Sequence, residues 1–349
     1  MTEAEERLLG EMAEQPQVVR RILQQAPPAV GRVVDRLRAT GPWSIVLCAR
    51  GSSDNAAVYA RYMLEIRARR VVSLAAPSTV TLYGSGPTLA RAAVIGISQS
   101  GRGEDVVAFL KSAHEQGAVT VAVVNAPVSP LSQHADFVLE LDAGEEVSVP
   151  ATKTLVAEMT VMAMLAEALA GSPPSLMNGL PDALEKALQL RPQAKAFAEH
   201  LARVQTCAVV GRGFGFPAAL ETGLKLKEMA GVHAESFSGA DFFHGPVTLI
   251  GSQHPVLLID VGGASTAPAL ATAEEIHRRG GIPLLLRAGE LRPSPLPYPT
   301  FQLPLRDLPE AFAPIAAVVL GQLVSYEAAL LRGVSPASPR GLQKITSTL

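Results

Sequence analysis

Four side chains in the second half of the sequence have the types needed for proton transfer and imine chemistry. Lys225 and Glu228 are three residues apart in a helical stretch, with Glu221 one turn earlier. This spacing is typical of a surface ion-pair ladder, but it also suits a carboxylate that a lysine holds for proton transfer. His244 follows two phenylalanines and precedes a Gly-Pro turn. It could simply pack there, or act as an acid or base near neutral pH.

Lys344, near the C-terminus, completes this set of reactive types. Its short polar surroundings are typical of a solvated terminal lysine. The alternative is an amine that forms a Schiff base with a carbonyl carbon. Composition alone does not choose between the two.

A polar turn in the first half has the features of an anion site. An apolar run over residues 94–97 stops at this turn, and helical spacing of apolar residues resumes after Glu104 and Asp105. The order predicts a buried strand followed by a helix N-terminus, where unpaired N–H groups and the helix dipole favour an anion. The turn offers polar side chains and flexible backbone at Ser98, Gln99, Ser100, Gly101 and Gly103. We interpret it as a phosphate-binding turn without the P-loop motif, the alternative being an ordinary capped turn.

Short apolar runs alternate with helical patterns along most of the chain, which predicts an α/β fold with doubly wound parallel sheets. Residues 2–39 are predicted to be mostly helical, with interruptions near Pro16 and Pro27. The first half is predicted to contain strands over 45–49, 71–74, 94–97, 119–124 and 137–141, and helices over 56–66, 104–116 and 151–170. The second half is predicted to contain helices over 181–203 and 217–229 and one ending at 276–279, with strands over 208–210, 256–259 and 282–286.

The two halves align at a constant offset, which indicates a duplicated α/β unit. Arg50 and Arg212 are 162 residues apart, and so are Ser98 and Asp260. Two unrelated α/β domains of similar length are the alternative. Because an aspartate at position 260 would repel phosphate, we expect only the first half to bind an anion.

Composition excludes several classes of protein. The 349 residues provide enough chain for two domains, and a net charge of −2 with 5% aromatic residues argues against a nucleic-acid partner. The acidic N-terminus has no apolar segment of a signal peptide. Residues 155–170 come closest to a membrane span, but Glu158 and Glu167 interrupt them, so no membrane partner is predicted.

Cysteine, histidine and glycine patterns narrow the class further. The 2 cysteines lie in apolar runs, which fits buried thiols and a cytoplasmic location. The histidines do not cluster, so no metal is predicted. The glycines over residues 211–215 lack the spacing of a dinucleotide fingerprint, and no cofactor is predicted.

A set of short motifs, in order along the chain, resembles a known family. The motifs are Ser98-Gln99-Ser100-Gly101, Ala151-Thr152-Lys153, Lys225-Leu226-Lys227-Glu228, His233-Ala234-Glu235, His244-Gly245-Pro246 and Pro339-Arg340 with Lys344. Together they resemble the isomerase half of glucosamine-6-phosphate synthase, which consists of two sugar isomerase (SIS) domains. The resemblance implies two tandem flavodoxin-like domains. The expected division is an N-terminal helical segment over 1–40, SIS domains over 41–171 and 204–330 with a helical linker over 172–203 between them, and an active-site tail over 331–349.

The resemblance also implies a role for each matched residue. Glu228 would move a proton between C1 and C2 of a hexose or hexosamine 6-phosphate, supported by Lys225. His244 would assist ring opening across the interface of a homodimer with a shared active site, and Lys344 would form an imine with the open ketose. The phosphate would be held by Ser52, Ser53, Ser98, Gln99 and Ser100. Val149 and Ala151 would lie beside the sugar.

The chain departs from the synthase pattern in three places. It begins Met1-Thr2, so we expect no glutaminase domain and no ammonia taken from glutamine by that route. Gly103 stands where the synthase has a phosphate-binding threonine, and Arg102 is the candidate to compensate. Ala151 stands where the synthase has a serine.

Two segments, Arg50-Gly51-Ser52-Ser53-Asp54 and Ser100-Gly101-Arg102, instead resemble the stand-alone SIS-type glucosamine-6-phosphate deaminases and their fructosamine-6-phosphate deglycase relatives. The predicted reaction is therefore deamination and isomerisation of glucosamine 6-phosphate to fructose 6-phosphate and ammonia. Deglycation, ammonia-dependent synthesis in reverse, and a non-catalytic sugar-phosphate sensor are the alternatives. SIS regulators usually carry a DNA-binding helix-turn-helix, and the acidic first forty residues offer no basic recognition helix.

Overall fold

The computed structural model describes residues 2–291 and 296–344, which form two compact units. Unit 1 comprises residues 2–16, 148–152 and 179–342, and unit 2 comprises residues 17–147, 153–178 and 343–344. The chain therefore passes between the units more than once.

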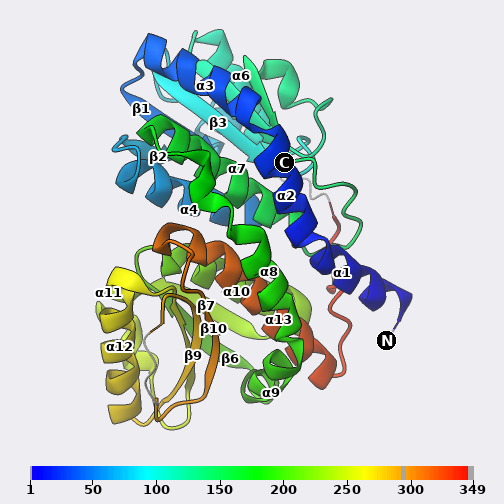
Figure 1. Cartoon of the computed structure of the whole chain (residues 1–349), viewed down its shortest axis with the longest axis vertical. Helices are drawn as coiled ribbons and strands as arrows, with labels where there is room; N and C mark the ends of the chain where they lie inside the picture. Colours follow the sequence, from blue (N-terminus) through cyan, green and yellow to red (C-terminus); the bar gives the residue numbers. More distant parts are fainter. Residues whose placement is uncertain (1, 292–295, 345–349) are drawn as a thin grey trace. The chain divides into compact units, whose positions relative to one another are not determined.

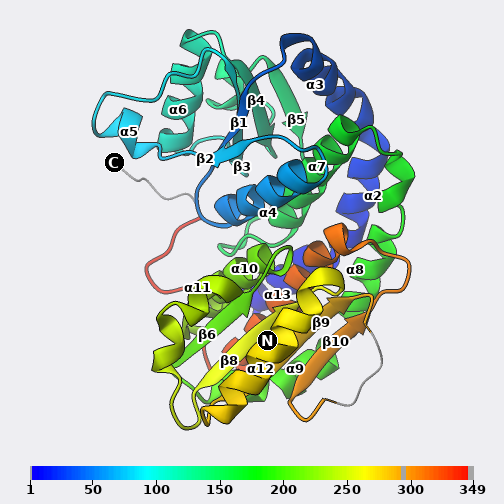
Figure 2. The same cartoon turned by 90° about the vertical axis from the view of Figure 1, so that its left-hand side faces the viewer.

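Unit 2 contains a five-stranded parallel sheet in the order β2-β1-β3-β4-β5. Its strands are β1 (Ser44–Cys48), β2 (Val72–Leu74), β3 (Ala92–Ser98), β4 (Val119–Val124) and β5 (Phe137–Glu140). Its helices are α2 (Gln15–Gln25), α3 (Pro27–Thr40), α4 (Ser52–Ile66), α5 (Ser78–Thr81), α6 (Glu104–Glu115) and α7 (Lys153–Ala170), with short 3₁₀ turns at Ser132–His134 and Pro174–Met177. Helices α5 and α6 cover one face of the sheet, and α3, α4 and α7 cover the other (Figure 2). Every strand predicted for the first half is present.

Unit 1 contains a second five-stranded parallel sheet, in the order β10-β9-β8-β6-β7. Its strands are β6 (Thr206–Gly211), β7 (His233–Ser238), β8 (Pro255–Asp260), β9 (Ile282–Gly289) and β10 (Thr300–Pro304). Its helices are α1 (Glu3–Ala13), α8 (Leu180–Gln189), α9 (Arg191–Ala202), α10 (Gly215–Ala230), α11 (Gly239–Phe243), α12 (Thr266–Arg278) and α13 (Ala313–Leu331), with 3₁₀ turns at Pro246–Leu249, Gly263–Ser265 and Glu310–Phe312. Figure 1 shows α11 and α12 on one side of this sheet and α10 and α13 on the other.

The two sheets have the same topology. In each sheet, the strand that comes second in the sequence lies at one edge, beside the first strand. The third, fourth and fifth strands then follow in order. This is the flavodoxin-like order, and it has a switch point where consecutive connections leave on opposite faces. The shared order supports a duplicated unit and confirms the predicted fold class of tandem α/β domains.

The structure corrects the sequence predictions for several elements. The strands β7 and β10 were not predicted, because each lies at a sheet edge, where only Ala234 of β7 and Phe301 and Leu303 of β10 are buried. Predicted helix 181–203 is two helices that meet at Leu190, since Pro192 in the first turn of α9 starts a new helix. The two phenylalanines before His244 belong to the short helix α11, which precedes the Gly-Pro turn.

The segment that comes closest to a membrane span is not residues 155–170, as expected from the sequence, but the helix at the end of unit 1. Residues Glu310–Leu331 are long and apolar enough, by length and composition, to cross a membrane, with a mean hydropathy of 1.6. Its most apolar stretch of 18 residues is 89% buried inside the protein, where α13 packs against α9 and α10. Glu327 on α13 forms an ion pair with Arg191 at 2.6 Å. A buried core helix has the same composition as a membrane span, and α13 is such a helix here.

Candidate functional site

The predicted phosphate residues gather at the switch point of unit 2. Strands β1 and β3 pair in parallel from Ser44–Ala92 to Cys48–Gly96. The chain leaves β1 into α4 on one face and leaves β3 into α6 on the other (Figure 2). Two helix N-termini therefore begin at one edge of the sheet, with Ser52 and Ser53 in the first turn of α4. Ligands of doubly wound folds bind in such a crevice.

Two serine hydroxyl groups stabilise the turn after β3 by accepting hydrogen bonds from its backbone. Ser98 Oγ accepts the Gly101 N–H at 3.1 Å, and Ser100 Oγ accepts the Arg102 N–H at 3.3 Å. Each serine still has its hydroxyl hydrogen to donate to a ligand. Gly101 has a φ of +63°, and a Cβ at this position would lie 2.2 Å from Ser129 Oγ, so only glycine fits here. Gln99 is half-buried beside the two serines.

The first turn of α6 contains a carboxylate whose charge is compensated. Asp105 is buried and accepts hydrogen bonds from Arg50 Nη2 at 2.6 Å and from Thr81 Oγ1 at 2.9 Å. An arginine bound to Asp105 reduces the repulsion that this carboxylate would exert on an anion. Arg102 is exposed, and Gly103 is the N-cap of α6 without a side-chain cap. The contact of Arg50 with Asp105 was not predicted from the sequence, because the two residues are 55 positions apart.

Ser53 has a partner that was not expected. Its Oγ donates to Oε1 of Glu158 on α7 at 2.8 Å, and Glu158 is buried. With its hydrogen engaged in this way, Ser53 presents an acceptor oxygen rather than a donor to a ligand. The neighbouring Ser52 is half-buried.

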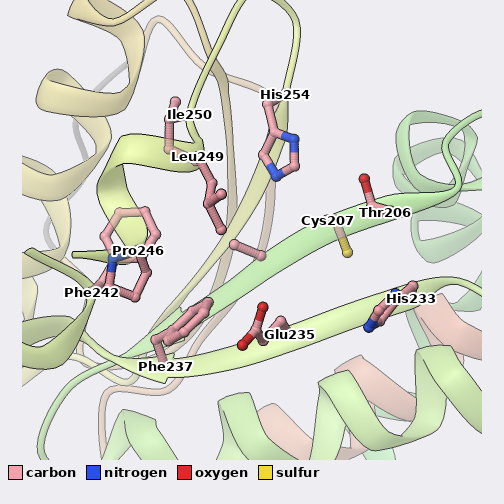
Figure 3. A pocket seen from close by; sticks show the side chains of 11 residues that line it. Thr206, Cys207, His233, Glu235, Phe237, Phe242, Pro246, Leu249, Ile250 and His254 are labelled. Atoms are coloured by element: carbon pink, nitrogen blue, oxygen red, sulfur yellow. The ribbon is translucent and has the colours of Figure 1, made fainter.

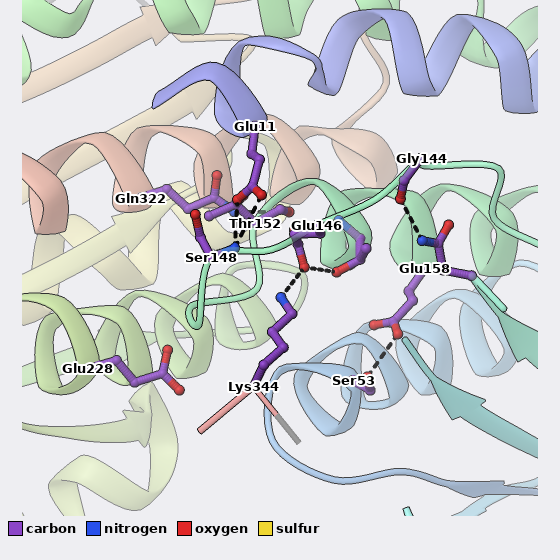
Figure 4. A network of polar contacts seen from close by, with 12 residues as sticks. Glu11, Ser53, Gly144, Glu146, Ser148, Thr152, Glu158, Glu228, Gln322 and Lys344 are labelled. Carbon is purple, nitrogen blue, oxygen red and sulfur yellow. Dashed lines mark hydrogen bonds and ion pairs between the residues drawn. The ribbon is translucent and has the colours of Figure 1, made fainter. Parts of the chain in front are cut away.

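Lys344 is held by a buried carboxylate rather than extended into solvent. Its Nζ lies 2.7 Å from Oε2 of Glu146 (Figure 4). Glu146 also accepts the Thr154 hydroxyl at 2.7 Å. The side chain of Lys344 is 22% exposed and that of Glu146 is 0% exposed. This placement contradicts the interpretation of Lys344 as a solvated terminal lysine. Glu146 was not predicted as a site residue, because its partner is 198 residues away in the sequence.

Lys225 forms ion pairs with Glu221 and Glu228, and this row of three residues in unit 1 is mostly buried. The interpretation as a surface ion-pair ladder is therefore wrong. Lys225 Nζ lies 3.2 Å from Glu221 and 2.5 Å from Glu228. The side chains of Lys225 and Glu221 are 0% and 1% exposed, whereas that of Glu228 is 17% exposed. Burial lowers the pKa of Lys225, but the two carboxylates outweigh this effect and raise the pKa above its ordinary value. The arrangement presents one carboxylate to solvent, and a buried ammonium group fixes its position.

His244 does not meet Glu228 within one chain. It is exposed at the end of α11, and Phe242 and Val247 on either side of it pack with Ala208 and Val210 of β6. Helix α10, which carries Glu228, packs on the other face of β6, where Gly223 lies against Val209. The sheet of unit 1 therefore separates His244 from Glu228.

The switch point of unit 1 is occupied by its own side chains. Asp260 is buried and pairs with Arg287 at 2.9 Å. It also accepts the Gly262 N–H at 2.9 Å and the Thr266 hydroxyl at 2.8 Å. Glu310 accepts the Ala264 N–H at 3.2 Å. Because carboxylates already take these donors, the geometry agrees with an anion site in the first half alone.

Four other motif residues and sugar-contact candidates lie elsewhere in unit 1. His233 and Glu235 line a separate cavity of about 270 Å³, together with Phe237, Phe242 and His254 (Figure 3). Val149 and Ala151 are half-buried in the segment over residues 148–152. Within residues 2–291 and 296–344, no group of three or more metal-binding side chains could hold a metal ion.

Comparison with known proteins assigns the chain to a family. The model of the SIS domain matches residues 41–168 and 200–332. The chain is 32% identical, over 97% of its length, to isomerizing glutamine–fructose-6-phosphate aminotransferase of Methanothermobacter thermautotrophicus. It is 30% identical to the protein of the same name from Thermus thermophilus. In both cases the similarity lies in the isomerase (SIS) half, and the chain spans only 56% to 58% of the relative's length.

Solved structures share the fold over nearly the whole chain. A candidate phosphosugar isomerase from Silicibacter pomeroyi is 30% identical with a TM-score of 0.86, over 95% of this chain and 99% of its own. A glucosamine-6-phosphate deaminase from Thermotoga maritima, at 18% identity and a TM-score of 0.76 over 98% of this chain and 99% of its own, shares the fold. The domain matches cover most of the sequence and agree with its two parallel sheets, and the chain belongs to the SIS domain family.

Proposed function

We propose that this protein is an amino-sugar phosphate isomerase that converts glucosamine 6-phosphate to fructose 6-phosphate and ammonia. The observation that carries this proposal is the row Glu221–Lys225–Glu228, in which a buried ammonium holds a partly exposed carboxylate. A carboxylate fixed in this way is suited to move a proton between two adjacent carbons. The anion crevice of unit 2 supplies the complementary function of holding a phosphate group.

The phosphate is proposed to bind at the N-termini of α4 and α6. Ser98, Gln99 and Ser100 would donate side-chain hydrogens, and the backbone N–H groups at Gly103 and Ser52 would add to the dipole attraction. The remaining proposed contacts are Ser53 and Arg102, with Val149 and Ala151 beside the sugar. Ser53 would need to release Glu158 before it could donate to a phosphate oxygen.

The proposed reaction begins with ring opening and ends with hydrolysis of an imine. His244 opens the ring by moving the hydroxyl proton of C1 to the ring oxygen. Glu228 removes the proton from C2 of the open aldehyde and returns it to C1, while the aldehyde oxygen takes up a proton and the C2 amine gives one up, which leaves a C2 imine and a C1 hydroxyl. The Lys344 amine attacks C2 and displaces ammonia, and water then hydrolyses the lysine imine to release fructose 6-phosphate.

Glu146 is the proposed proton acceptor for Lys344. An ammonium group has no lone pair with which to attack a carbon atom, so Lys344 must lose a proton first. The buried Glu146 carboxylate lies 2.7 Å from Nζ, within the distance over which a proton is transferred. The amine then leaves the ion pair as a neutral nucleophile, and Glu146 keeps the proton.

The test of this proposal is an assay for both products. The protein is incubated with glucosamine 6-phosphate, and ammonia and fructose 6-phosphate are measured together. Equal release of the two supports the deaminase. Turnover of a fructosamine 6-phosphate alone would replace it with the deglycase, and tight binding without any product would replace it with a sensor.

The reverse reaction is the second candidate, because the curated relatives carry the name aminotransferase. Fructose 6-phosphate and ammonium ions are supplied together, and formation of glucosamine 6-phosphate is followed. The ratio of the forward and reverse values of kcat/KM, measured under one set of conditions, shows which direction the protein favours.

A homodimer with shared active sites is proposed because the sheet of unit 1 separates Glu228 from His244. In a twofold dimer, each site would combine Glu228 of one copy with His244 of the other. Coexpression of inactive Glu228→Gln and inactive His244→Ala chains should then restore about a quarter of wild-type activity, because about half of the dimers are mixed and each has one intact site. Tagged copies purified in tandem isolate the mixed dimer. If that dimer is inactive, His244 does not act across the interface.

We also propose a cytoplasmic location. Cys48 and Cys207 are both free and buried, and burial raises the pKa of each thiol to about 12. Buried free thiols of this kind are typical of proteins from a reducing compartment.

A further inference from the structure

We propose that Glu11, Gln15 and Gln322 are positioning residues that hold the segment over residues 148–152 at the sugar. This inference rests on the proposed function and adds to it the N-terminal helix α1 and the start of α2. All the residues concerned belong to unit 1, although residues 148–152 are flanked in sequence by parts of unit 2. The segment is therefore anchored to unit 1 by its own contacts.

The first anchor holds the beginning of the segment. Both carboxylate oxygens of Glu11 accept the Ser148 N–H, at 3.2 and 3.3 Å (Figure 4). Glu11 is only 4% exposed. Moving a charged carboxylate out of water is unfavourable. A buried glutamate is therefore usually held by hydrogen-bond donors, as Glu11 is held by the Ser148 N–H. The bond also joins two parts of the chain that are 137 residues apart.

The second anchor holds the end of the segment. Gln322 on α13 donates through Nε2 to the Thr152 carbonyl at 3.4 Å, and Gln15 donates through Nε2 to Gln322 Oε1 at 3.0 Å. Gln15 and Gln322 are both 0% exposed. Among the described residues, Gln15 Oε1 has no hydrogen-bond partner, which is unfavourable in a protein core. An amide pair that remains in the core despite this penalty indicates that the orientation of Gln322 matters.

Only three residues lie between the two anchors, and two of them are the proposed sugar contacts. Val149 and Ala151 are half-buried, whereas Ser148 and Thr152 at the ends are buried. Fixing the backbone at both ends leaves little freedom to the residues between them. The anchors should therefore affect how tightly the sugar binds. They should not affect the binding of inorganic phosphate, whose proposed site belongs to unit 2.

The experiment compares Glu11→Ala and Glu11→Gln with a matched control, Glu6→Gln, an exposed glutamate on the same helix. For each protein we measure kcat and KM for glucosamine 6-phosphate, and the affinities for fructose 6-phosphate and inorganic phosphate by calorimetry. Glu11→Ala should raise KM by about 10-fold and weaken the affinity for fructose 6-phosphate to a similar extent. The affinity for inorganic phosphate should not change. Glu11→Gln keeps one acceptor and should give a smaller change, and Glu6→Gln should give none.

A second variant guards against a failure of Glu11→Ala to fold. Gln322→Met keeps the volume of the side chain but removes the bond to Thr152, and it should reduce the preference for fructose 6-phosphate over phosphate in the same direction. If both variants lower only the melting temperature, with both affinities unchanged, the anchors are structural and the inference is overturned. Because calorimetry needs no turnover, an inactive wild-type protein would overturn the proposed function without deciding this inference, which the two affinities test separately.

Discussion

Replacing Glu228 with glutamine should lower turnover of glucosamine 6-phosphate by roughly a thousandfold, within the range of 10² to 10⁴ that general acid–base catalysis contributes. The amide keeps the size of the side chain and can still accept a hydrogen bond from Lys225, so unit 1 should fold normally. It cannot take a proton from C2, so the chemical step slows while binding does not. We expect KM to stay within a few-fold of wild type, which is the pattern for an interaction needed only in the transition state.

Two further variants make the Glu228 result specific. Lys227→Gln changes an exposed residue of the same helix and should leave kcat unaltered. Glu228→Asp restores a carboxylate at a shorter reach and should recover part of the activity. Because Glu228 is 17% exposed, part of the proton that it carries should exchange with solvent, so some solvent deuterium should enter C1 of the product with wild type and not measurably with Glu228→Gln. If the glutamine variant retained full turnover and label, another group would move the proton.

Replacing Lys225 with methionine should destabilise the protein by about 3–5 kcal/mol, as expected when one partner of a buried ion pair is removed. Glu221 is 1% exposed and lies 3.2 Å from Lys225 Nζ, so removing the ammonium takes a neighbouring positive charge away from a buried carboxylate. Methionine fills most of the volume of lysine, so a cavity contributes little to the expected loss. Urea unfolding followed by circular dichroism measures the effect.

The control for Lys225→Met is the double variant Glu221→Leu with Lys225→Met. It removes both buried charges and should recover most of the lost stability, because a well-packed apolar pair often replaces a buried ion pair without penalty. The double variant should still be a weak enzyme, since nothing then holds Glu228. If the single variant unfolds at the wild-type urea concentration, the buried pair contributes nothing to stability.

The ion pairs of Lys225 also determine how the stability of the folded protein changes with pH. The pKa of Lys225 is raised in the folded protein above its ordinary value of 10.5, because the neighbouring carboxylates outweigh burial. The folded state therefore holds this proton more tightly than the unfolded state does. Its contribution to stability is fully present below the unfolded pKa and is lost as the pH rises through the folded pKa. The difference between wild type and Lys225→Met should be constant near neutral pH and shrink only in strongly alkaline solution.

Local patterns in the sequence were sufficient for most of the fold. The apolar run of β4 was predicted at its observed bounds, since a central parallel strand is buried on both faces and its sequence is apolar throughout. Edge strand β7 was missed because only some of its positions are buried, so its pattern resembles a loop. Helix α13 was missed as a core helix because apolar composition on all sides contains no amphipathic period.

The candidate site was predictable where its contacts are local. The Ser98–Gly101 and Ser100–Arg102 hydrogen bonds span two or three residues, and the turn that they form was recognised from its composition. The partners of Ser53 and Lys344 lie 105 and 198 residues away, and no local pattern points to Glu158 or Glu146. Such contacts form only when the topology brings distant segments together.

The sequence by itself determined which chemical groups are available and that they are carried by duplicated α/β domains, because side-chain type and periodicity are local properties. Spacing also placed Glu221, Lys225 and Glu228 on one helical face. Only the tertiary structure decided that this face is covered, which turns a surface ladder into a buried ion-pair row. It alone decided that a sheet separates Glu228 from His244, because periodicity says which residues share a face and not what packs against that face.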